Sequence, residues 1–199
     1  MKKAAVVWLG VMLIGLVFVG LEASAQVQDI NKVSPREVKL DKNYDGVIDA
    51  IETYDEKGEI MKVAVDSTGD GQMNEWIYYK DTQPYKAEKD TTGDGVANAF
   101  LTYKKGKLIK VETDANGDSI IDEWVYYEAE VAVKAEKDTN ADGEPDTWLT
   151  YTAGMVAKVE VDTDGDTKID EWIYYEDGKP IKAEKDTNAD GEADTWMDY

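Results

Sequence analysis

Acidic side chains recur along this chain at a spacing that could hold a divalent cation. Aspartate opens seven similar segments: Asp41, Asp66, Asp90, Asp114, Asp138, Asp162 and Asp186. The first interval between them is 25 residues, and each of the next five is 24 residues. Aspartate also fills the fifth position of every segment: Asp45, Asp70, Asp94, Asp118, Asp142, Asp166 and Asp190. The chain therefore repeats a pair of carboxylates in phase, which points first to chemistry based on carboxylate oxygens.

Oxygen-bearing side chains fill two further positions of each acidic loop. The third position holds Asn43, Thr68, Thr92, Asn116, Asn140, Asp164 and Asn188. The ninth position holds Asp49, Asn74, Asn98, Asp122, Asp146, Asp170 and Asp194. Glycine stands at the sixth position in five loops and at the fourth, as Gly117 and Gly165, in the other two. Calcium takes six to eight oxygen ligands gathered by a tightly turning backbone, whereas magnesium demands a stricter octahedron. The spacing therefore predicts a Ca²⁺ site in each loop.

The repeated pattern resembles the D-x-[DN]-x-D-G loop of EF-hands, dockerins and thrombospondin type 3 repeats. The resemblance covers about nine residues per repeat and does not extend to the helices that flank an EF-hand loop. It implies a bidentate Glu at the twelfth position, which only the first loop has, as Glu52. Other candidate donors are Glu75, Glu123 and Glu171 at the tenth position, and Glu136 before the fifth loop. Without the twelfth ligand we expect weak sites, with dissociation constants of ~10⁻⁴–10⁻³ M.

The simpler alternative is that these segments are only turns, because Asp, Asn and Gly also favour turns. Seven such loops in phase would, however, crowd carboxylates together, and like charges at close range are unfavourable unless a cation lies among them. We therefore favour the metal sites over the turns.

Short strand-like segments connect the acidic loops. Residues 76–79 and 172–175 are aromatic and β-branched, whereas residues 109–113 and 181–185 alternate apolar and charged side chains. Turn signals separate them: Lys57–Gly58, Lys105–Gly106, Ala153–Gly154 and Asp177–Gly178, with weaker signals at Gln83–Pro84 and Ala129–Glu130. The repeat is thus strand, turn, strand and acidic loop. We expect an all-β fold, an antiparallel β-meander whose sheet stays open or curls towards a barrel or propeller.

Aromatic side chains occupy regular places in the repeat. Five of them are Trp76, Trp124, Trp148, Trp172 and Trp196. Their regularity favours a core shared by neighbouring strands. The alternative is an exposed platform that binds a polysaccharide or an extracellular protein.

The N-terminal segment has the features of a secretory signal peptide. Lys2 and Lys3 precede an apolar run over residues 4–20, and an A-x-A cleavage signature, Ala23–Ser24–Ala25, ends it. We expect a signal-peptide helix at residues 1–25, a linker at 26–40 and the repeat domain at 41–199. The alternative is an uncleaved membrane anchor. Cleavage would place the mature protein in the periplasm or outside the cell.

Composition excludes several classes of function. The formal net charge is −21, and the chain has neither Cys nor His, which removes the usual nucleophile–base pairs and transition-metal ligands. This charge disfavours nucleic acid and anionic membrane surfaces as partners. A carboxylate-based hydrolase is a remote alternative, because nearly every Asp belongs to a repeated loop. We expect a calcium-binding repeat protein, not an enzyme, that acts as a calcium-stabilised structural or interaction module.

Overall fold

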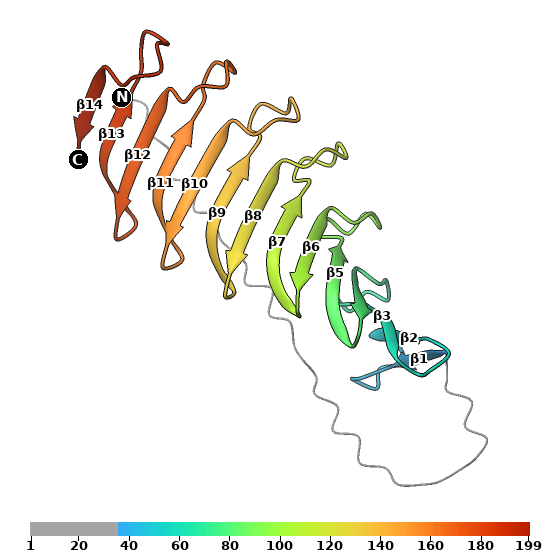
Figure 1. Cartoon of the computed structure of the whole chain (residues 1–199). Helices are drawn as coiled ribbons and strands as arrows, with labels where there is room; N and C mark the ends of the chain where they lie inside the picture. The colour runs from blue at the N-terminus through green and yellow to red at the C-terminus, as the bar shows by residue number, and fades with distance from the viewer. Residues whose placement is uncertain (1–35) are drawn as a thin grey trace, which may run out of the picture. The chain divides into compact units, whose positions relative to one another are not determined.

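A computed structural model describes residues 36–199, which form one antiparallel sheet of 14 strands. Each strand pairs with its neighbours in sequence order (Figure 1). The strands are β1 (Glu37–Leu40), β2 (Ala50–Tyr54), β3 (Ile60–Val65), β4 (Glu75–Lys80), β5 (Gln83–Lys89), β6 (Ala99–Lys104), β7 (Lys107–Thr113), β8 (Glu123–Glu128), β9 (Val131–Lys137), β10 (Thr147–Thr152), β11 (Met155–Val161), β12 (Glu171–Glu176), β13 (Lys179–Lys185) and β14 (Thr195–Asp198). β1 and β14 do not pair with each other, so the sheet is open. The predicted all-β meander is confirmed.

The beginning of the sheet differs from the expected domain boundaries. The predicted signal peptide at residues 1–25 lies outside the described residues. The predicted linker, residues 26–40, ends in β1, which pairs antiparallel with β2. Val38 and Leu40 alternate with Glu37 and Lys39, which is the period of a half-buried strand. Among residues 36–199 there is no helix long and apolar enough to cross a membrane.

Tight turns join the strands at the ends opposite the acidic loops (Figure 1). In five of these turns, both central residues have positive φ: Asp81–Thr82, Lys105–Gly106, Ala129–Glu130, Ala153–Gly154 and Asp177–Gly178. Two-residue turns of this kind match the twist of antiparallel strands. The predicted turn at Gln83–Pro84 was wrong, because both residues belong to β5 and the chain reverses at Asp81–Thr82 instead.

A bulge recurs in the hairpins on the turn side of the sheet. In the β4–β5 hairpin, Tyr78 lies opposite Lys86 but Tyr79 lies opposite Pro84, so Tyr85 is the extra residue. The same shift occurs between Tyr126 and Tyr127 and between Tyr174 and Tyr175. A bulge bends its strand and increases the local right-handed twist. Repeating it at one place in successive hairpins gives each of these hairpins a similar bend.

One face of the sheet, here called the aliphatic face, carries most of the buried strand residues. Its central row runs across the strands in register and includes Ala87, Leu101, Val125, Ala135 and Leu149. All five are buried, and Ala135 has no exposed surface. Tyr151 packs beside Val125 and Leu149 in the same apolar cluster. The core of this single-layer sheet is therefore built from small aliphatic residues and tyrosine.

The opposite face, here called the tryptophan face, alternates aromatic and acidic residues across the strands. Glu136 lies between Trp124 and Trp148, and Glu184 lies between Trp172 and Trp196. The first three tryptophans are partly buried, and Trp196 is 60% exposed. The predicted tryptophan core was wrong, because alternation along each strand puts these side chains on the face away from the buried aliphatic row.

The tryptophan face is joined by a repeated polar network. Tyr126 lies under the ammonium groups of Lys110 and Lys134, at 5.5 and 5.6 Å from the ring centroid. The Tyr126 hydroxyl donates a hydrogen bond of 2.8 Å to Glu136, which also pairs with Lys134. The same arrangement surrounds Tyr78 and Tyr174. Cross-strand contacts of this kind stabilise a sheet that has no second layer.

Candidate metal centres

The acidic loops lie in a row where they join the strand ends on one side of the sheet (Figure 1). The backbone N–H at the first position of each loop after the first donates to the carbonyl at the ninth position of the loop before it. Asp162, for example, donates to Asp146, and Asp186 donates to Asp170, at 2.9 and 2.8 Å. Successive loops are two strands apart, which is about 10 Å at the usual strand spacing. The sheet therefore positions the loops as a ladder of similar sites.

The opening aspartate of each loop after the first is buried. In loops one to six, the two carboxylate oxygens of the opening aspartate accept hydrogen bonds from the backbone N–H groups of the fourth and sixth residues, at 2.6–2.9 Å. Burial raises the pKa of Asp66, but hydrogen bonds from Gly71, Gly69 and Thr68 outweigh it and lower the pKa below its usual value. The loop therefore holds this carboxylate in its charged form.

A left-handed backbone makes this arrangement possible. The fourth and sixth residues have positive φ in all seven loops, where N–H groups turn inward towards the opening Asp. Asp162 thus receives bonds from Gly165, with φ of 78°, and from Thr167, with φ of 73°. Thr167 shows that the loop adopts this shape even where a β-branched residue is unfavourable.

The third and fifth side chains also turn back to the loop backbone. The fifth-position Asp accepts a hydrogen bond from the N–H of the seventh residue in every loop, at 2.8–2.9 Å. In five loops the third side chain accepts a bond from the fifth N–H. Thr68 and Thr92 instead donate their hydroxyls to the opening Asp. With Thr at the third position and Asn at the ninth, the second and third loops have the fewest carboxylates.

The ninth side chain closes each loop from the other end. Asp170 accepts hydrogen bonds from the N–H and the hydroxyl of Thr163, at 2.7 and 2.6 Å. These bonds lower the pKa of Asp170 below its usual value. A Ser or Thr at the second position makes the same contact in five loops. Sequence reasoning missed this second position, although the recurrence of Ser or Thr after the opening Asp was its signal.

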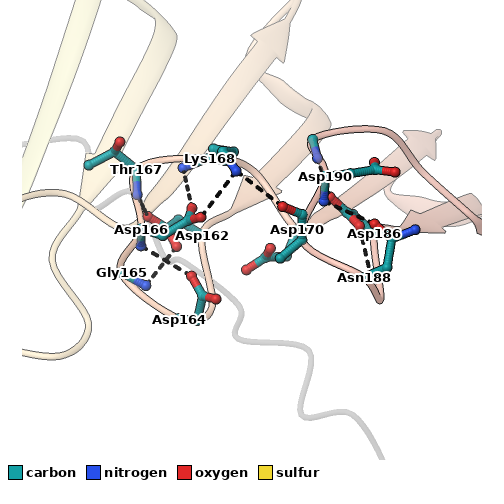
Figure 2. A network of polar contacts seen from close by, with 12 residues as sticks. Asp162, Asp164, Gly165, Asp166, Thr167, Lys168, Asp170, Asp186, Asn188 and Asp190 are labelled. Carbon is teal, nitrogen blue, oxygen red and sulfur yellow. Dashed lines mark hydrogen bonds and ion pairs between the residues drawn. The ribbon is translucent and has the colours of Figure 1, made fainter.

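The sixth loop gathers more carboxylates than the others. Among the described residues, Asp162, Asp164 and Asp166 form the group in which one carboxylate oxygen from each residue lies within 4.8 Å of the others. Asp164 distinguishes the sixth loop from the others, because every other loop has Asn or Thr at the third position. Figure 2 shows these three side chains on one turn of the loop, with Asp170 nearby. The structure thus brings three predicted ligands together here, whereas the other loops gather fewer carboxylates.

The predicted supplementary glutamates are engaged elsewhere. Glu52 accepts a hydrogen bond from the Tyr54 hydroxyl. Glu75, Glu123 and Glu171 form cross-strand ion pairs with Lys89, Lys137 and Lys185. Glu136 belongs to the network on the tryptophan face. None of these residues joins a group of three carboxylates in the described part of the chain.

The donor set nevertheless suits a hard divalent cation. The loops offer carboxylate, amide and backbone oxygens, and the chain contains no Cys or His. Oxygen ligands of this kind suit Ca²⁺, which tolerates irregular geometry and variable ligand number. Asp162, Asp164 and Asp166 would provide the side-chain ligands in the sixth loop, and a bound ion would neutralise charges that otherwise repel one another.

Comparisons with known proteins identify no family. No protein-family model and no curated protein matches the chain. One matching solved structure is the crystal structure of accessory secretory protein 1,2 and 3 in Streptococcus pneumoniae, at 13% identity and a TM-score of 0.34. The match covers 63% of this chain but only 20% of that chain. A TM-score this low supports no conclusion about fold or function.

Proposed function

We propose that the protein is a calcium-binding repeat protein whose loops hold Ca²⁺ in a row at one end of the strands of an open sheet. The observation that carries this proposal is the cluster of three carboxylates in the sixth loop, which each place one oxygen within 4.8 Å of the others. Three negative charges at this distance favour a divalent cation among them. The other loops share the same backbone arrangement and would bind more weakly.

The fold suggests a structural or interaction role for the bound ions. Each loop joins two strands, and hydrogen bonds link each loop to the next. A cation that orders one loop therefore also fixes the ends of the strands beside it. Ligands that bind only the folded state stabilise it by mass action. We infer no enzymatic activity, because the acidic residues recur as equivalent loops rather than forming a distinctive active site.

Calorimetric titration of the protein with CaCl₂ tests the proposal. We expect heats that fit several weak sites, with dissociation constants of ~10⁻⁴–10⁻³ M. MgCl₂ should give weaker binding, because Mg²⁺ requires a stricter geometry. The variant Asp162→Asn with Asp166→Asn should lose the tightest site. Absence of calcium heat at millimolar concentrations would contradict the proposal.

We also propose that the protein is exported to the periplasm or beyond. The apolar run at residues 4–20 and the A-x-A signature before Gln26 support this proposal. Weak calcium sites suit extracellular conditions, where calcium is abundant. Intact mass of the protein recovered outside the cytoplasm should show a chain that begins at Gln26. Retention of residues 1–25 would instead support a membrane anchor.

A second candidate function is the binding of a polysaccharide or an extracellular protein. It is favoured by the aromatic row of the tryptophan face, which is only partly buried and ends at Trp196, 60% exposed. Tryptophan fluorescence during titration with soluble polysaccharides would test it. Trp196→Ala should weaken any binding, and the control Tyr44→Ala changes an exposed aromatic residue in the first loop.

A further inference from the structure

The sixth loop contains a lysine whose ammonium group lies beside its carboxylates. Lys168 occupies the seventh position, and its Nζ lies 3.4 Å from Oδ2 of Asp166. The same Nζ donates a hydrogen bond of 3.1 Å to the carbonyl oxygen of Ala189, in the seventh loop. Its side chain crosses close to Gly191, whose Cβ, if present, would lie 3.8 Å from the Lys168 Cδ. Lys168 therefore bridges the sixth and seventh loops (Figure 2).

No other loop has a cation at this position. The seventh residues of the other loops are Val47, Gln72, Val96, Ile120, Glu144 and Glu192. The single lysine thus coincides with the single described group of three clustered carboxylates. Because the side chain reaches both a carboxylate of its own loop and a carbonyl of the next, it is placed to respond to any cation that enters the sixth loop.

We propose that Lys168 is an internal competitor for the metal at the sixth loop. The inference rests on the proposed function, that Ca²⁺ binds among Asp162, Asp164 and Asp166. In the metal-free protein the ammonium group supplies positive charge to Asp166 and ties this loop to Ala189. A bound Ca²⁺ replaces that charge and repels the ammonium group, which must leave Asp166. Lys168 therefore makes binding at the sixth loop weaker than its carboxylates alone would allow.

The size of the effect follows from the exposure of the ion pair. The side chains of Lys168 and Asp166 are 52% and 37% exposed, so solvent screens their attraction. Breaking an exposed pair of this kind changes an equilibrium by about two- to fivefold. Removing the positive charge should therefore tighten calcium binding by about that factor, and reversing the charge should tighten it further. The effect should weaken as salt increases.

Nuclear magnetic resonance can measure each loop separately. The amide signals of Gly165 and Gly143 report on the sixth and fifth loops, and calcium titration gives a midpoint for each. We expect Lys168→Gln to lower the Gly165 midpoint about two- to fivefold, and Lys168→Glu to lower it more. Glu144→Lys places the same charge at the matched position of the fifth loop and should raise the Gly143 midpoint. The control Glu144→Gln shows how far the Gly143 midpoint changes when the carboxylate is lost without a lysine being added.

The outcomes distinguish this inference from the proposed function. An unchanged Gly165 midpoint in both Lys168 variants, with calcium still binding, would overturn the competitor role and leave the metal site intact. A Gly165 signal that calcium does not move, in wild type and variants alike, would overturn both. Hydrogen exchange in chelator provides a readout without metal: Lys168→Gln should reduce protection near Ala189. Unchanged protection there would contradict the bridge.

Discussion

At the scale of single residues, the loops differ by a few side chains on one shared backbone. Asp164 gives the sixth loop its third clustered carboxylate, whereas Asn140 occupies the same position in the fifth loop. Both side chains accept a hydrogen bond from the fifth N–H of their own loop. The two loops therefore keep the same shape while differing in charge, which makes them a matched pair.

Exchanging these two residues should exchange the order of calcium affinity. Asp164→Asn removes one carboxylate ligand and should weaken the sixth site by roughly tenfold, since loss of about 1.4 kcal/mol changes affinity tenfold. Asn140→Asp should strengthen the fifth site. Calcium titration followed through the amide signals of Gly165 and Gly143 measures both changes. If both midpoints stay unchanged, the number of carboxylates does not control affinity.

Tyrosine ionisation should limit stability at high pH. Burial, with the hydrogen bond to Glu136, raises the pKa of Tyr126 from 10.0 to about 12, and Tyr78 shifts in the same direction for the same reasons. The folded state thus keeps protons that the unfolded chain releases above pH 10. This stabilisation is complete below pH 10 and is lost as the pH rises towards 12. Urea unfolding at about pH 9 and 11 should show a lower midpoint at the higher pH, and equal midpoints would contradict the assignment.

At the scale of elements, the tight turns and bulges set the geometry of each hairpin. Glu130 has φ of 66° in the β8–β9 turn, and Gly178, with φ of 73°, holds the matching position in the β12–β13 turn. A left-handed conformation costs an ordinary residue roughly 1–2 kcal/mol, and glycine avoids most of that cost. The two turns therefore differ in backbone strain at equivalent places.

Substitutions at these turns should have opposite effects. Glu130→Gly should raise the free energy of unfolding by about 0.5–1 kcal/mol, because relief of strain exceeds the added entropy of the unfolded chain. Gly178→Ala should lower it by about 1 kcal/mol through backbone strain alone, since no atom lies within 4 Å of the added Cβ. Denaturant unfolding measures both. A destabilised Glu130→Gly protein would show that the Glu130 side chain contributes more than its strain costs.

Sequence periodicity predicted the strands and loops because the same residue types return every 24 positions. It could not predict the turn at Asp81–Thr82, since neither residue is glycine and the signal at Pro84 competed with it. It also placed Trp124 and Trp172 in the core, because aromatic composition does not show which face of a single-layer sheet is buried. The sequence already shows that the sixth loop alone has Asp at its first, third and fifth positions, but the close approach of the Asp162, Asp164 and Asp166 carboxylates depended on side-chain geometry.

At the scale of the whole described sheet, stability should be distributed along the strands. Each strand pairs only with its neighbours in sequence, and β14 has β13 as its single pairing partner. In such an array, stability is approximately a sum of unit and interface contributions. A loop in the interior therefore supports strands that have further neighbours on both sides, whereas the seventh loop supports the terminal pair, β13 and β14.

Removing the acidic side chains of an interior loop should loosen its neighbours more than the same change at the edge. Asp118→Ala with Asp122→Ala should reduce hydrogen-exchange protection in β7 and β8. It should also lose the Asp122 bonds to the N–H groups of Ala115 and Asn116. Asp190→Ala with Asp194→Ala should affect β13 and β14 and reduce total stability less. Equal global unfolding by both pairs would contradict independent neighbouring units.

Thermal unfolding with and without calcium tests the central claim most directly. The protein would be compared in chelator and at increasing calcium concentrations, with magnesium as the control cation. If Ca²⁺ holds the loops, the melting temperature should rise and keep rising into the millimolar range, because several weak sites fill together and bind only the folded state. A melting temperature that is unchanged between chelator and about 5 mM calcium would contradict the claim that metal stabilises this sheet.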